Sequence, residues 1–258
     1  MRHNIRQAKA RSAAKDQKKR SRPWFRMAAA FLFLALVGGG GFQLLTHPQT
    51  PLPSAWNPTI PLRIADPVTP LTGWKLSRAA QDPVACLVAL DGFADVTPQQ
   101  NREVSENCHI RNRVELSGVG QARLRAIETR CPIALRLAMW EQHSLQPAAQ
   151  DLLGTSVAEI LHIGSYNCRA MRTGSADDPP RMSTHATADA IDISGFTFAD
   201  GRRVSLLNHW DDNMPEAAFL RQARDGACRF FKLTLSPDYN TLHADHFHLQ
   251  SVGWGLCR

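Results

Sequence analysis

One uncharged stretch most limits what this chain can fold into. Residues 27–45 run for 19 positions without a charged side chain, which is just enough for a helix to span the hydrocarbon core of a bilayer. Ten basic residues and one acidic residue occupy residues 1–26. The positive-inside rule keeps such a basic flank in the cytoplasm and places the rest of the chain outside. We therefore expect a single-pass protein of the inner membrane with a periplasmic C-terminal domain.

A cleaved signal peptide is the competing interpretation of the same stretch. No cleavage site of the small-x-small type follows Leu45, and no cysteine stands there for lipidation. An uncleaved membrane anchor is therefore the preferred interpretation.

The positive charge of the chain belongs to its N-terminal tail. Beyond residue 26 the chain holds 20 basic and 22 acidic residues, although the whole chain has 30 and 23. A generally basic surface, and with it a nucleic-acid partner, is excluded for the rest of the protein. The tail of residues 1–26 is best explained as a flank that is attracted to anionic lipid.

The remaining sequence predicts a linker and one domain. Seven prolines between residues 47 and 70 disfavour a regular helix, so we assign residues 46–69 to a Pro-rich linker and residues 70–258 to the domain. Within the domain, helical patterns over residues 76–90 and 132–140 mix with strand-like runs at 113–117 and 157–163. No regular βαβ alternation is visible, so the expected class is α+β.

All six cysteines lie beyond the apolar stretch. An even number in an exported domain predicts three disulfides, and no pair has the C-x-x-C spacing of a zinc or redox site. Fifteen connectivities are possible, among which a Cys228–Cys257 bridge would fix the C-terminus beside the histidine-rich segment. The six are Cys86, Cys108, Cys131, Cys168, Cys228 and Cys257.

Two short segments of the last third contain the residues that could carry chemistry. In residues 190–193 the alternation of Ala, Ile, Asp and Ile suits a strand that buries its isoleucines and turns Asp192 to the other face, where His185 can meet it. In the segment His243-Ala-Asp-His-Phe-His-Leu249, a strand would place His246 and His248 on one face, about 7 Å apart. Zinc accepts imidazole and carboxylate, and catalytic sites use three such ligands. His185, Asp192 and His248 would form that set.

These segments resemble the motifs of LAS-type metallopeptidases, the group of lysostaphin-like, D-Ala-D-Ala-cleaving and Hedgehog-like folds. The pattern S-x-H-x-x-G-x-A-x-D is matched at four positions, and the spacing His243-x-x-His246-x-His248 is similar to that of penicillin-insensitive murein endopeptidases. Residues from about 67 to 258 also resemble the bacterial extensin-like C-terminal family. That resemblance rests on Gly164-Ser-Tyr-Asn-Cys-Arg169, Ser183-Thr-His-Ala186, Asp225-Gly-Ala-Cys-Arg229, Ser236-Pro-Asp-Tyr-Asn240, His246-Phe-His-Leu249 and Cys257-Arg258.

The LAS resemblance implies a fold, a metal and roles for individual residues. It implies a small antiparallel sheet, flanked by helices, that carries a Zn²⁺ site, with His185, Asp192 and His248 as ligands and His246 as the catalytic histidine. Asp245 is the alternative base, Arg169 would stand near the scissile carbonyl or else in a surface ion pair, and His243, Tyr166 and Ser183 would contact substrate.

Two positions depart from these patterns. Ala188 replaces the glycine of the first motif, which adds strain if its φ is positive. Gln250 stands where the extensin-like pattern leads us to expect an aspartate, so a contact behind the ligands would differ.

Three functional hypotheses follow from the sequence. The first is a zinc peptidase that hydrolyses stem-peptide or cross-link amide bonds of peptidoglycan. The second is a catalytically silent module of the same fold that binds the wall or serves as a scaffold. In the third, the basic tail is the functional partner site of a membrane protein.

Overall fold

The computed structural model describes residues 23–171, 181–211 and 213–258, and it divides into two compact units. The basic tail as far as residue 22 lies outside the described residues. The first unit ends at Pro53 and contains helix α2 (Pro23–Thr46), and the second comprises Ser54–Arg258.

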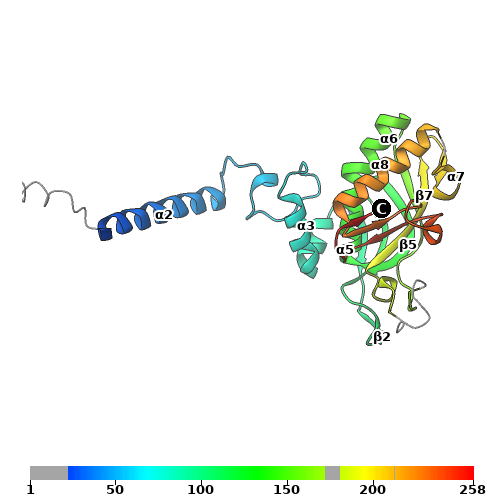
Figure 1. The fold of residues 1–258 in the computed structure, drawn as a ribbon, viewed down its shortest axis with the longest axis horizontal. Coiled ribbons are helices and arrows are strands. Elements are labelled where there is room, and N and C mark those ends of the chain that lie inside the picture. The colour runs from blue at the N-terminus through cyan, green and yellow to red at the C-terminus, as the bar shows by residue number, and fades with distance from the viewer. Residues whose placement is uncertain (1–22, 172–180, 212) are drawn as a thin grey trace, which may run out of the picture. The chain divides into compact units, whose positions relative to one another are not determined.

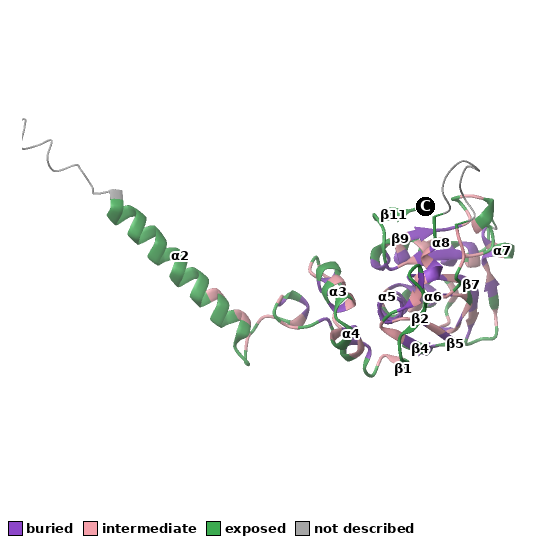
Figure 2. Cartoon of the chain, turned by 90° about the horizontal axis from the view of Figure 1, so that it is seen from below, coloured by how far each residue is buried: buried purple, intermediate pink, exposed green. Residues whose placement is uncertain are grey.

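Helix α2 includes the whole uncharged stretch. Its segment Trp24–Thr46 is long and apolar enough to cross a membrane, by length and composition. Its side chains are exposed almost throughout, as the green ribbon in Figure 2 shows. A signal sequence has the same length and composition, so the helix supports either membrane anchoring or export.

The second unit begins within the segment that we assigned to the linker. Ser54 accepts a hydrogen bond from Lys75 Nζ (2.6 Å) at its backbone oxygen and donates one from its hydroxyl to Asp66 (2.7 Å). Leu62 and Ile64 are buried in the core. The part of the assigned linker from Ser54 onward therefore packs on the domain and is not a free spacer.

Most helices of the second unit begin where the sequence offers a cap or a proline. Asp82 accepts hydrogen bonds from the backbone N–H groups of Val84 and Ala85, and Pro83 occupies the first turn, so the expected helix over 76–90 divides into two. Residues 141–145 form a π-helical turn between α5 and α6. The helices are α3 (Thr72–Gln81), α4 (Pro83–Leu90), α5 (Cys131–Trp140), α6 (Gln146–Leu153), α7 (Leu206–His209) and α8 (Pro215–Phe230).

The sheet is larger than we expected and it is mixed. Nine strands pair in the order β1-β4-β5-β6-β7-β10-β9-β11, with β8 on β7, and a separate hairpin pairs β2 with β3. The pairs β5–β6 and β9–β11 are parallel, and the other pairs are antiparallel. The strands are β1 (Ala94–Pro98), β2 (Arg102–Ser105), β3 (Cys108–Ile110), β4 (Arg113–Val119), β5 (Ala122–Arg130), β6 (Val157–Gly164), β7 (Ala190–Phe198), β8 (Arg203–Ser205), β9 (Leu233–Leu235), β10 (Phe247–Gln250) and β11 (Leu256–Cys257).

The expectation of a small antiparallel sheet was wrong because of the connection between β5 and β6. Parallel strands need a crossover, and here α5, the π-helical turn and α6 supply it. α5, α6 and α8 lie together beside the sheet (Figure 1). Trp140 of α5 and Phe219 of α8 both pack edge-on against Phe196 of β7, with ring centroids 5.9 and 5.2 Å apart. The α+β class is confirmed.

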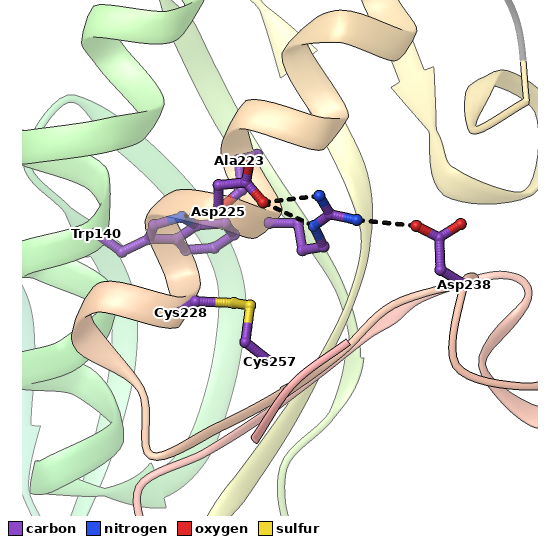
Figure 3. Close-up of a disulfide and its surroundings, with 7 residues drawn as sticks. Trp140, Ala223, Asp225, Cys228, Asp238 and Cys257 are labelled. Atoms are coloured by element: carbon purple, nitrogen blue, oxygen red, sulfur yellow. Dashed lines mark hydrogen bonds and ion pairs between the residues drawn. A yellow bond between two sulfur atoms is a disulfide. The ribbon is translucent and has the colours of Figure 1, made fainter. Parts of the chain in front are cut away.

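Three disulfides join distant parts of the second unit, as the sequence predicted. They link Cys86 with Cys131, Cys108 with Cys168 and Cys228 with Cys257, and no cysteine is free. The third bridge joins α8 to β11 (Figure 3), which confirms the pair favoured from the sequence.

With all three bridges closed, the unreduced protein is expected to expose no thiol even when it is denatured. Labelling with a maleimide in guanidinium should modify no cysteine before reduction and six after it. Two or more labelled cysteines before reduction would contradict the pairing.

Candidate functional site

Three side chains from different elements converge at the centre of the sheet. Asp192 on β7 and His248 on β10 are direct cross-strand partners, and His185 lies in the short 3₁₀ helix η4 (Thr184–Thr187) just before β7. His248 Nδ1 is 2.8 Å from Asp192 Oδ1, and His185 Nε2 is 3.2 Å from Asp192 Oδ2 and from His248 Nδ1. One ligand atom of each residue lies within 4.8 Å of the others, so the group could hold a metal ion.

Strand alternation brings Asp192 to this place, as the sequence predicted. Ile191 and Ile193 have no exposed surface and belong to the core. Asp192 lies between them on β7, and its side chain keeps 13% exposure. The apolar neighbours therefore fix the strand, and the pleat turns the carboxylate to the opposite face.

A backbone carbonyl sets the orientation of His185. Its Nδ1 lies 2.7 Å from the carbonyl oxygen of Ser165, the residue that follows β6. A carbonyl only accepts, so Nδ1 carries the proton and Nε2 turns its lone pair to Asp192 and His248. The hydroxyl of Ser165 is itself held between Ala190 O (2.7 Å) and Thr129 Oγ1 (2.8 Å). This arrangement fits a metal-ligating histidine.

Gln250 contacts the far side of the His248 ring. Its amide lies 2.6 Å from His248 Nε2. If Nδ1 ligates a metal, Nε2 carries a proton and needs an acceptor, and the amide oxygen can serve after a half-turn of the amide group. Glutamine can thus take the place of the aspartate that the family pattern led us to expect, without adding a charge.

The charges of the site also suit a cation. Burial alone would raise the pKa of Asp192, but hydrogen bonds and charge interactions with His185 and His248 outweigh it and hold that pKa well below its usual range. Burial lowers the pKa of His248, and burial together with the neighbouring His246 and His248 lowers the pKa of His243 to about 4. At neutral pH the Asp192 carboxylate is therefore ionised and the His248 imidazole is neutral, as metal ligation requires. The His243 imidazole, which is not one of the three candidate ligands, is neutral as well.

His246 reaches the cluster although it lies outside β10, whereas the sequence analysis placed it inside that strand. β10 begins at Phe247, so His246 is the residue just before it. Its Nε2 is nevertheless 3.6 Å from Asp192 Oδ1, and its Nδ1 is 2.7 Å from Asp245 Oδ1. Asp245 is 55% exposed and bonds to His246, so it supports that ring from the outside.

His243 completes a row of three imidazoles. It closes the 3₁₀ helix η5 (Thr241–His243), and its ring centroid lies 5.2 Å from that of His246 and 5.7 Å from that of His248. Its Nδ1 lies 2.7 Å from Asn240 Oδ1. Asn240 is a supporting residue that the sequence analysis did not identify, although it ends the Ser236–Asn240 motif.

The loop that leads to His243 is fastened to helix α8. Asp238 accepts hydrogen bonds from Trp210 Nε1 and Arg224, each 2.8 Å long. Arg224 also bonds to Asp225, and Figure 3 shows Asp225 and Asp238 in the surroundings of the Cys228–Cys257 disulfide. The loop is therefore held at Asp238, while its histidine end faces the cluster.

Three predicted site residues do not join the cluster directly. Ser183 caps η4 by accepting a hydrogen bond from the backbone N–H of His185 (3.3 Å), so it helps to position that histidine. The guanidinium of Arg102 lies 5.2 Å from the ring centre of Tyr166, and the Tyr166 hydroxyl is buried without a hydrogen-bond partner among the described residues. Arg169 donates to Ala170 O (3.3 Å). Their roles toward substrate stay predictions.

The backbone is strained at Ala188, the residue that replaces the glycine of the S-x-H-x-x-G-x-A-x-D motif. Ala188 has φ 51° and ψ 30° in the left-handed region, at a cost of about 1 kcal/mol relative to glycine. Asp189, the next residue, holds the turn by bonding to Thr187 (2.7 Å), Ser251 (3.0 Å) and Arg130. This network keeps η4 and its histidine in place despite the strain.

Comparison with known proteins concerns the C-terminal part of the chain. Residues 84–258 match the family described as extensin-like protein C-terminus. Neither a curated protein nor a solved structure matches the chain significantly. Because the family match covers more than half of the 258 residues, the chain belongs to the extensin-like protein C-terminus family.

Proposed function

We propose that the domain is a zinc-dependent peptidase that hydrolyses stem-peptide or cross-link amide bonds of peptidoglycan. The observation that carries the proposal is the convergence of His185, Asp192 and His248, whose ligand atoms lie within 4.8 Å of one another. Two imidazoles and one carboxylate form a donor set that zinc accepts with a further position open. The motif resemblance to LAS-type peptidases supports the choice of a peptide substrate in the wall.

Each residue of the cluster then has a defined task. His185, Asp192 and His248 would hold Zn²⁺, which when bound polarises a carbonyl and lowers the pKa of water. His246 would accept a proton at Nε2, since Asp245 engages its Nδ1. His243, Tyr166 and Ser183 would contact substrate, and Arg169 would lie near the scissile carbonyl.

Digestion of purified muropeptides by the zinc-loaded protein tests this proposal. Mass spectrometry of the products should show a mass gain of one water for each bond that is cut, and it identifies the bond. Binding to sacculi without any cleavage would favour a catalytically silent wall-binding or scaffold module. Function that survives deletion of residues 54–258 would point to the basic tail.

The location of the domain is part of the same proposal. Three closed disulfides favour an oxidising compartment, and α2 provides one apolar helix between the basic tail and the domain. We infer an N-terminus in the cytoplasm, an anchor in the inner membrane and a domain in the periplasm.

A C-terminal fusion to alkaline phosphatase is expected to be active, because that enzyme needs an oxidising compartment for its own disulfides. A matched fusion to a reporter that functions only in the cytoplasm should be inactive. The opposite pair of results would reverse the orientation.

A further inference from the structure

A cavity lies in a part of the domain that contributes nothing to the histidine cluster. Its volume is about 170 Å³, it is open to solvent on one side, and it is lined by the loop of residues 58–62 and by helices α3 and α4. The cluster is built from η4, β7 and the segment around β10. The two sites therefore use separate elements of the same unit.

One wall of this cavity is an exposed indole. Trp74 on α3 lines the cavity and keeps 45% of its surface exposed. The guanidinium carbon of Arg78, one helical turn further on, lies 5.0 Å from the centre of the Trp74 ring. An indole left at a concave surface offers a flat apolar area with a polar edge, on which a ligand ring can stack.

Polar groups next to the indole can form hydrogen bonds of both kinds. Arg78 is a donor, and within the described part of the chain no carboxylate forms an ion pair with it. Asp82 uses its Oδ1 to cap α4 (2.9 and 3.1 Å), which leaves its second oxygen as an acceptor at the cavity wall. Lys75 is engaged with Ser54 O (2.6 Å) and serves the loop.

This combination selects among classes of ligand. An anion would meet Asp82 as well as Arg78, and a purely apolar group would leave both without partners. A sugar ring satisfies all three side chains, because its C–H face stacks on an indole while its hydroxyls donate to a carboxylate and accept from a guanidinium. Apart from Thr59 and Lys75, the remaining lining residues, among them Pro58, Ile60 and Ala85, are apolar and suit the methyl of an acetamido group.

We infer that this cavity binds an N-acetylhexosamine unit of a polysaccharide strand. The inference rests on the proposed function for its choice of polymer, since the stem peptides of peptidoglycan are attached to a strand of such sugars. The cavity would hold the strand, while the histidine cluster acts on the peptides.

Titration with chitotetraose, an oligomer of N-acetylglucosamine without any stem peptide, tests the inference. The Ser54–Arg258 unit is suitable because the core, the sheet and the three disulfides all lie within it.

In ¹H–¹⁵N spectra of this unit, the indole signal of Trp74 should shift saturably as chitotetraose is added. Trp74→Ala should weaken binding about tenfold. Arg78→Met should also weaken binding, and it should leave the domain folded because the Arg78 side chain is exposed. Trp254→Ala is the matched control, because that indole is fully exposed and does not line the cavity.

Several results would overturn the inference. They are the absence of a Trp74 shift with chitotetraose, equal weakening by Trp254→Ala, and a shift produced by free stem peptide alone. The binding requires neither zinc nor His246, so His246→Ala should bind chitotetraose like the wild type. A failure of muropeptide cleavage therefore does not contradict the inferred sugar binding. Likewise, a failure to bind chitotetraose does not contradict the proposed peptidase activity.

Discussion

Replacing His246 by alanine is expected to leave zinc binding intact and to lower the rate of muropeptide cleavage by about a hundredfold or more, the usual effect of removing a positioned acid or base. The reason is geometric. The Nε2 atom lies 3.6 Å from Asp192 Oδ1 at the edge of the proposed metal site, and Asp245 engages Nδ1 from the other side. His246 is thus beside the three proposed ligands without being one of them.

The measurement is the initial rate of cleavage at matched zinc content. Asp245→Ala should reduce the rate less, since this carboxylate is 55% exposed and acts through the His246 ring. His109→Ala is the matched control, because that histidine bonds locally to Glu106 O and lies outside the cluster. Equal rates for the wild type and His246→Ala would reject the role of this residue.

The histidine and aspartate cluster could be predicted because it depends on strand alternation. Ile191 and Ile193 identify the buried face of β7, and that assignment alone turns Asp192 to the other side. The contact of His248 with Asp192 follows once β10 pairs with β7 in register. The alternation within each strand is local and is determined by adjacent residues, whereas the pairing of β7 with β10 is long-range.

The supporting residues could not be predicted by the same reasoning. Ser165 orients His185 through its backbone oxygen, which every residue type possesses. The size of the sheet depends on the crossover through α5 and α6, a long-range pairing that period-2 patterns do not encode. The start of the packed unit could not be predicted either, because a segment with seven prolines has the composition of a spacer. Only the structure shows that Leu62 and Ile64 are buried in the core.

Removal of His248 is expected to abolish zinc binding while the fold survives. Alanine here deletes the Nδ1 atom that lies 2.8 Å from Asp192 and 3.2 Å from His185, so two of the three proposed ligands remain. Three disulfides and a core independent of the site keep the domain together. Zinc measured by atomic spectroscopy after dialysis should fall from one per domain to a small fraction.

The comparison with a histidine elsewhere makes this result specific. His143 is also partly buried, and its Nε2 lies 2.7 Å from Ile64 O, away from the cluster. His143→Ala should therefore lower the unfolding temperature and leave the zinc content unchanged, whereas His248→Ala should remove the increase in unfolding temperature that zinc gives to the wild type. Full zinc occupancy in His248→Ala would refute the ligand set. Loss of zinc together with loss of the folded state would instead indicate that zinc serves mainly in folding, as closed four-ligand sites do.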